Sequence, residues 1–149
     1  MPRLLRNVLA IVGGIVAGAV VNGALITLSA SLIPAPPGVD VTNTESLAKG
    51  MHLFEPRHFA MPFLAHALGT FFGGLAAYLM ASSHKPRIAY VIGVVFLCGG
   101  VAASFMIPAP GWFMALDLAL AYLPMAWLAI RAGSRMQSNP SAQQSWRKA

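Results

Sequence analysis

The chain has 149 residues, of which 57% are hydrophobic and only 9% are charged, and its formal net charge is +6. Soluble domains carry about 25% charged residues, so this chain has too little polar surface for a globule in water. The length suits one domain. With a single cysteine, Cys98, no intramolecular disulfide is possible. We therefore expect a small all-α membrane protein.

The first apolar segment covers residues 8–33, which hold no Asp, Glu, Lys or Arg. Arg3 and Arg6 precede it, as in a secretory signal, but the run is about twice as long as the apolar core of such a signal. We expect a retained membrane span. Gly14 and Gly18 form a G-x-x-x-G row that Asn22 continues at i+4. Small residues let a second helix approach, and a membrane-embedded amide favours an interhelical hydrogen bond.

The connection after this span is the longest in the chain and begins with prolines, which end the helix. Within it, residues 44–54 predict a short interfacial helix with Leu47, Met51 and Phe54 on one side. His52, Glu55 and His58 are spaced as in a metal site. Proline at position 56 breaks the helix that this spacing needs, so we expect no metal site.

The second span covers residues 59–80, and its His66, Gly69 and Gly73 share one helical face. A tight basic turn at 82–87 leads to the third span, residues 88–107, in which we expect Cys98 to be a small buried apolar filler. The fourth span covers residues 112–130 and contains Asp117. The four spans make a transmembrane domain of residues 1–133, and residues 134–149 predict a disordered basic cytoplasmic tail.

The basic residues fix the expected orientation. With the amino terminus in the cytoplasm, the outer loops receive Lys49 and Arg57, and the other eight of the ten basic residues lie inside. These eight are Arg3, Arg6, Lys85, Arg87, Arg131, Arg135, Arg147 and Lys148. Positive residues keep loops inside, so both termini are predicted to be cytoplasmic and the fold to be a four-helix bundle of two hairpins.

One pair of residues is a candidate for chemistry. Asp117 lies about 8 Å into the fourth helix and His66 about 10 Å into the second, and both helices enter from the outer face. A carboxylate inside a membrane is costly and faces the bundle to find partners. We expect Asp117 and His66 to form a pair, with Asn22, Thr70 and Tyr122 as further members. Two interpretations stay open: the pair locks the helices together, or it is a proton relay or a binding site.

Common catalytic motifs are missing from the sequence. It has no G-x-G-x-x-G, Walker loop, H-E-x-x-H or G-x-S-x-G, and its single cysteine excludes C-x-x-C redox chemistry. Hence the sequence does not favour an enzyme, and we expect neither a cofactor nor a metal. Nucleic acid is a poor candidate partner because the basic residues are divided among three membrane-flanking segments. Membrane lipid is the expected partner.

Several motifs recur at the ends and on the faces of the expected helices. They are the helix stops Ile33-Pro34-x-Pro36-x-Gly38 and Ile107-Pro108-x-Pro110-Gly111-Trp112, the segment Ala65-His66-Ala67-x-Gly69-Thr70 with Gly73-Gly74, and Tyr122-Leu123-Pro124-Met125-Ala126-Trp127. Together these motifs resemble a group of small bacterial four-span proteins without an assigned activity. The resemblance implies a bacterial inner-membrane protein with this architecture, and it implies no activity.

Two functions remain open. The packing glycines Gly14, Gly18, Gly69 and Gly73 suit close helix contacts within one protomer or between copies. On this basis we expect an oligomeric scaffold or an accessory subunit of a larger membrane complex. The alternative is a small transporter or channel for a proton, a cation or a small polar solute that uses His66 and Asp117.

Overall fold

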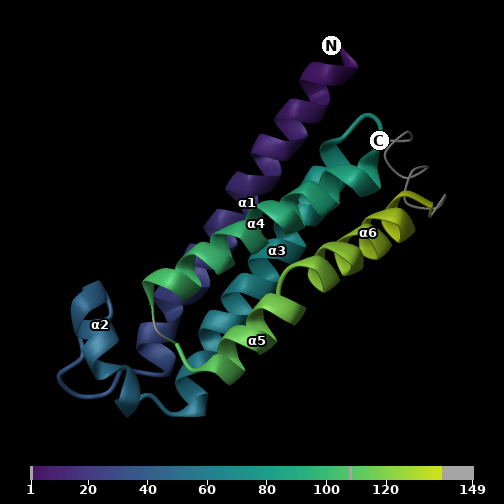
Figure 1. Cartoon of the computed structure of the whole chain (residues 1–149). Helices are drawn as coiled ribbons and strands as arrows, with labels where there is room; N and C mark the ends of the chain where they lie inside the picture. The colour runs from purple at the N-terminus through teal and green to yellow at the C-terminus, as the bar shows by residue number, and fades with distance from the viewer. Residues whose placement is uncertain (1, 108, 139–149) are drawn as a thin grey trace.

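The computed structural model describes residues 2–107 and 109–138, and in these residues the regular structure is entirely helical (Figure 1). Four helical segments are long and apolar enough to cross a membrane: Arg3–Leu32, Pro56–Met80, Lys85–Met106 and Gly111–Ser138. The first is helix α1, and the second is the 3-10 turn η2 (Pro56–Phe59) followed by α3 (Ala60–Met80). The third is α4 (Lys85–Met106), and the fourth divides into α5 (Gly111–Leu120) and α6 (Leu123–Ser138). The expected all-α class with four candidate spans is confirmed.

Helix α3 is the central element. It contacts α1, α4 and α6, whereas α1 contacts only α3 and α4 extensively. The start of α1, the turn between α3 and α4 and the end of α6 lie at one end of the bundle, and the short helix α2 (Thr44–Gly50) lies at the other (Figure 1). We call these the terminal end and the α2 end.

The glycine rows of the first two spans face each other. A Cβ added at Gly14 would lie 2.7 Å from the carbonyl oxygen of Gly73, and one added at Gly18 would lie 2.6 Å from that of Gly69. In the other direction, a Cβ added at Gly73 would lie 2.7 Å from the carbonyl oxygen of Gly14, and one added at Gly69 would lie 3.0 Å from that of Gly18. All four glycines are buried between α1 and α3. The predicted close contact therefore forms within the protomer.

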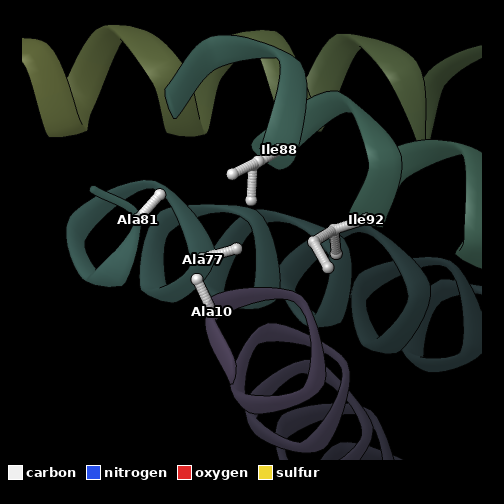
Figure 2. Packing of buried hydrophobic residues seen from close by; sticks show 5 residues of the cluster. All are labelled: Ala10, Ala77, Ala81, Ile88 and Ile92. Carbon is white, nitrogen blue, oxygen red and sulfur yellow. The ribbon is translucent and has the colours of Figure 1, made fainter. Parts of the chain in front are cut away.

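A small apolar cluster joins three helices near the terminal end. Ala10 of α1, Ala77 of α3, and Ile88 and Ile92 of α4 are buried together with Ala81 (Figure 2). Alanine side chains on α1 and α3 leave space that the two isoleucines of α4 fill. The cluster holds α4 in the groove between the first two spans, which fixes the orientation of the second hairpin.

Helix α1 begins at Arg3, five residues before the expected span, because polar contacts extend it. The amide of Asn7 donates to the Ser83 hydroxyl at 2.9 Å, and its carbonyl oxygen accepts the Ser82 N–H at 3.0 Å. Arg6 Nε donates to the carbonyl oxygen of Met80 at 2.9 Å. These hydrogen bonds tie the start of α1 to the turn between α3 and α4.

Two expectations for the later helices need correction. Cys98 is exposed on the bundle surface and is therefore not a filler of the interior. Helix α6 continues to Ser138, so residues 134–138 of the expected tail are helical. Lys85 Nζ donates to Gln137 Oε1 at 2.8 Å, which ties this last turn to α4. Residues 139–149 of the expected tail lie outside the described residues.

The long connection folds over the α2 end of the bundle. It comprises α2, the 3-10 turn η1 (Met51–Leu53) and η2. The Asn43 side chain accepts the Ser46 N–H and caps α2, as Asn commonly does at a helix start. In front of it, the Thr42 hydroxyl and N–H both donate to Asp40 Oδ1, and the hydroxyl hydrogen bond lowers the pKa of the Asp40 carboxyl.

Candidate functional site

His66 and Asp117 meet in the interior of the bundle. His66 Nδ1 lies 2.9 Å from Asp117 Oδ1 and 3.0 Å from Oδ2. The Asp117 side chain is 7% exposed and the His66 side chain 25% exposed. His66 projects from α3 and Asp117 from α5, so the contact joins two elements 51 residues apart in sequence. The pair expected from similar depth in two helices is thus brought together.

Tyr122 is the third member of the site. Its hydroxyl donates to Asp117 Oδ2 at 2.8 Å, and its ring stacks on the His66 ring with centroids 6.0 Å apart. Tyr122 lies at the break between α5 and α6, where Pro124 has no N–H to continue the helix. The break turns the Tyr122 side chain back toward Asp117, which is only five residues earlier.

The room for the Tyr122 hydroxyl comes from a glycine on a third helix. A Cβ at Gly100 of α4 would collide with the hydroxyl oxygen of Tyr122 and with its ring. Tyr122 is 2% exposed, so the ring has no open side to move into. The sequence contains no signal for this role of Gly100, because the contact depends on how the two hairpins pack together.

The hydrogen bonds define which atom of the histidine is available. Because an ionised carboxylate only accepts hydrogen bonds, a pair of ionised Asp117 and neutral His66 places the imidazole proton on Nδ1. The other ring nitrogen, Nε2, then carries a lone pair. No hydrogen bond to Nε2 is found among residues 2–107 and 109–138. This arrangement, a carboxylate orienting an imidazole whose second nitrogen is open, suits proton transfer or acceptance of a hydrogen bond.

A cavity of about 430 Å³ opens beside the pair, within the size range of small-molecule sites. It lies at the α2 end, between the ends of α1 and α4, the starts of α3 and α5, and the long connection. Its lining is predominantly apolar; the polar side chains among the lining residues are those of Ser29, His58, His66, Ser104 and Asp117. No lysine or arginine lines it in the described part of the chain.

The connection covers this cavity with its apolar side. Leu47, Met51 and Phe54, which the sequence places on one side of a short helix, all line the cavity. The rings of Phe59 and Phe113 pack together at an interplanar angle of 39° with centroids 4.8 Å apart, and they form another part of the wall. Hence α2 and the turns around it cover part of the cavity at the α2 end of the bundle, above the histidine–aspartate pair.

Beyond Tyr122 the helices are tightly packed. A Cβ at Gly74 of α3 would lie 3.2 Å from the Ala129 Cβ, and one at Gly93 of α4 would lie 2.8 Å from the Ala126 Cβ. Ala126 and Ala129 of α6 are fully buried. The small residues therefore seal the terminal half of the bundle, and the cavity is one-sided.

Two expected members do not join the hydrogen-bond network. The Thr70 hydroxyl donates to the backbone carbonyl oxygen of His66 at 2.8 Å, one turn away on the same helix. The Asn22 side-chain oxygen is buried and has no hydrogen-bond partner among the described residues. Its Cβ lies against Gly69, so Asn22 belongs to the α1–α3 contact and does not line the cavity.

The histidines of the connection are engaged locally. His52 Nδ1 contacts the carbonyl oxygen of Lys49 at 2.9 Å, and His58 Nδ1 accepts the Glu55 N–H at 2.9 Å. Within the described residues, no group of three His, Cys, Asp or Glu side chains is arranged to hold a metal ion.

Comparisons with protein-family models, with curated proteins and with solved structures find no match to this chain. The site must therefore be interpreted from its geometry.

Proposed function

We propose that the protein is a multi-pass protein of the bacterial inner membrane that binds a small amphipathic solute beside His66 and exchanges a proton there, as a small transporter does. The observation that carries the proposal is the buried His66–Asp117–Tyr122 network at the floor of an apolar one-sided cavity. Ionisable groups inside membrane proteins are functional candidates by default.

The chemistry of the floor favours a solute with a hydrogen-bond donor. His66 Nε2 offers a lone pair, Asp117 contributes negative charge, and no lysine or arginine among the described residues balances that charge in the cavity. An ammonium or hydroxyl head group would find an acceptor, whereas a carboxylate would face a like charge. The apolar walls suit a short hydrocarbon body, because burial of each CH₂ contributes about 0.8 kcal/mol.

The one-sided cavity favours a carrier over an open channel. Passage to the terminal end would require α3, α4 and α6 to separate at their small-residue contacts. The break at Ala121 and Tyr122 offers a joint at which α5, with Asp117, moves relative to α6. If the charge distribution sets the orientation as expected, the cavity faces the outer side of the membrane.

Calorimetric titration of the protein in lipid nanodiscs tests the proposal, with empty nanodiscs subtracted. We expect hexylamine and hexanol to bind and hexanoate to bind much more weakly. Asp117→Asn removes the negative charge and leaves a single amide oxygen as the acceptor at this position, so hexylamine affinity should fall about 10–100-fold. Glu45→Gln is the matched control, because Glu45 forms an exposed ion pair with Lys49 and does not line the cavity.

A proteoliposome measurement tests the proton exchange. Hexylamine added outside should change the internal pH faster with the wild-type protein than with Asp117→Asn, as followed by an entrapped pH dye. Equal rates in the two preparations would exclude Asp117 from the transport step. Equal binding of hexylamine and hexanoate would contradict a donor-selective site.

The scaffold or accessory-subunit hypothesis remains a prediction. It depended on glycine faces available to a partner, and Gly14, Gly18, Gly69 and Gly73 are buried between α1 and α3 of one protomer. We therefore place the solute-binding proposal first.

A further inference from the structure

A second groove, separate from the histidine–aspartate cavity, runs between α3 and α6. It encloses about 410 Å³, and its apolar walls include Leu68 and Phe71 of α3 and Met125 and Leu128 of α6. Arg131 and Arg135 of α6 line its continuation toward the terminal end. An apolar trough that leads to two guanidinium groups is amphipathic along its length.

The two arginines have no carboxylate to pair with in the described structure. The chain contains four acidic residues in total. Glu45 pairs with Lys49, Glu55 with Arg57, and Asp117 with His66. Asp40 lies in the connection over the α2 end, at the opposite end of the bundle from the last turns of α6 (Figure 1). Within the described residues, therefore, no carboxylate side chain balances the positive charge of the groove.

The position of the arginines along the bundle fits a phospholipid head group. Gln137, which accepts the hydrogen bond from Lys85, marks the last turn of α6, and Arg135 lies only two residues before it. Arg131 lies about 6 Å deeper by helical rise, and its guanidinium stacks over the Trp127 ring at 4.3 Å. Tryptophan and arginine side chains together mark the level where lipid head groups meet acyl chains.

We propose that this groove binds an anionic phospholipid of the surrounding bilayer, with its phosphate on Arg131 and Arg135 and an acyl chain along Leu68, Phe71 and Leu128. Arginine binds phosphate through several N–H donors at once. This favours a specific phosphate site in the groove over a diffuse attraction to the membrane surface. The inference rests on the membrane placement in the proposed function but is independent of any solute at His66.

Native mass spectrometry of the detergent-purified chain tests the proposal, with phosphatidylglycerol or phosphatidylcholine added in turn. The variant Arg131→Gln/Arg135→Gln should lose affinity for phosphatidylglycerol by about 30-fold, from the attraction of two basic residues to an anionic lipid. The charge-retaining variant Arg131→Lys/Arg135→Lys should recover part of that loss. Arg3→Gln/Arg87→Gln is the matched control, since it removes the same charge near the same end outside the groove.

Preferential retention of phosphatidylglycerol that only the Arg131/Arg135 glutamine variant abolishes would support the site. Equal loss in the control pair would overturn it, because the attraction would then be nonspecific. Complete displacement of the lipid by millimolar inorganic phosphate would also overturn it, because the groove would then hold a free anion. The Asp117→Asn protein should keep full lipid binding, so failure of the solute proposal and failure of this one give different results.

Discussion

At the residue scale, the site depends on the hydrogen bonds that the Asp117 carboxylate accepts. Its carboxylate accepts from His66 and from Tyr122 and has almost no contact with solvent. Charge-assisted hydrogen bonds of this kind are stronger than neutral ones, and losing a partner of a buried charge is costly. Asp117 therefore both orients the imidazole and holds α5 against α3.

Removal of the Tyr122 hydroxyl should show how much its hydrogen bond to Asp117 contributes to stability. Tyr122→Phe keeps the ring stacked on His66 but leaves one carboxylate oxygen with fewer partners, so we expect a loss of about 1.5–3 kcal/mol in unfolding free energy. Titration with sodium dodecyl sulfate, followed by circular dichroism, measures it. Tyr90→Phe, at an exposed tyrosine of α4, is the control. An equal effect of both substitutions would argue against a structural role for the Tyr122 hydrogen bond.

The sequence was informative about the site where depth alone mattered. His66 and Asp117 could be paired because both lie a short distance into helices that start at the same end. Thr70 and Asn22 make no hydrogen bond to the side chains of this pair in the structure. The Thr70 hydroxyl donates to the backbone of its own helix, and Asn22 lies where α1 meets Gly69. The cavity walls come from five separate segments, and no local pattern predicts how such segments meet.

At the scale of the element, the glycine faces of α1 and α3 bring the two helix backbones into direct contact. Gly73→Ala would bring a Cβ to 2.7 Å from the Gly14 carbonyl oxygen, which is backbone and cannot rotate away. We expect a loss of about 1–3 kcal/mol in unfolding free energy from the forced separation of the two helices.

The matched control for this prediction is Gly99→Ala. Gly99 lies inside α4, and nothing is found within 4 Å of an added Cβ there. Because alanine favours the helix over glycine by about 1 kcal/mol, this substitution should leave stability unchanged or raise it. Sodium dodecyl sulfate titration of both variants gives the comparison, and similar losses in both would show that the α1–α3 contact is not the cause.

The apolar runs predicted the helices but not all of their ends. A stretch without charged residues shows which part of a helix hydrocarbon tolerates. Helix α1 nevertheless starts at Arg3, because Asn7 and Arg6 form hydrogen bonds with the turn between α3 and α4. The composition of the fourth span predicts one continuous helix, but the structure breaks it at Ala121 and Tyr122. Pro124 signalled a disturbance there, and the hydrogen bond from Tyr122 to Asp117 decides which way the chain bends.

At the scale of the whole molecule, basic and acidic residues are concentrated at opposite ends of the bundle axis. Basic residues of α1, α4 and α6 gather at the terminal end, while the connection over the α2 end holds three of the four acidic residues. We expect this asymmetry to orient the protein with the terminal end in the cytoplasm.

Cysteine labelling in intact cells tests the orientation. In a Cys98→Ser background, Leu53→Cys at the α2 end should react with a membrane-impermeant maleimide added outside. Met136→Cys at the terminal end should react only after the membrane is opened. Both positions are exposed, so accessibility of the side chain itself is matched. The opposite pattern would invert the topology and place the cavity on the cytoplasmic side.

The missing side chain at Gly100 has a consequence for how the protein tolerates change. A single methyl group added there would push the phenol of Tyr122 off the acid and disarrange the imidazole stacked beside it. A survey of substitutions would then mark position 100 as no less sensitive than the ionisable groups themselves. A glycine without a functional group, on α4, would in this way control the position of the imidazole of His66 on α3.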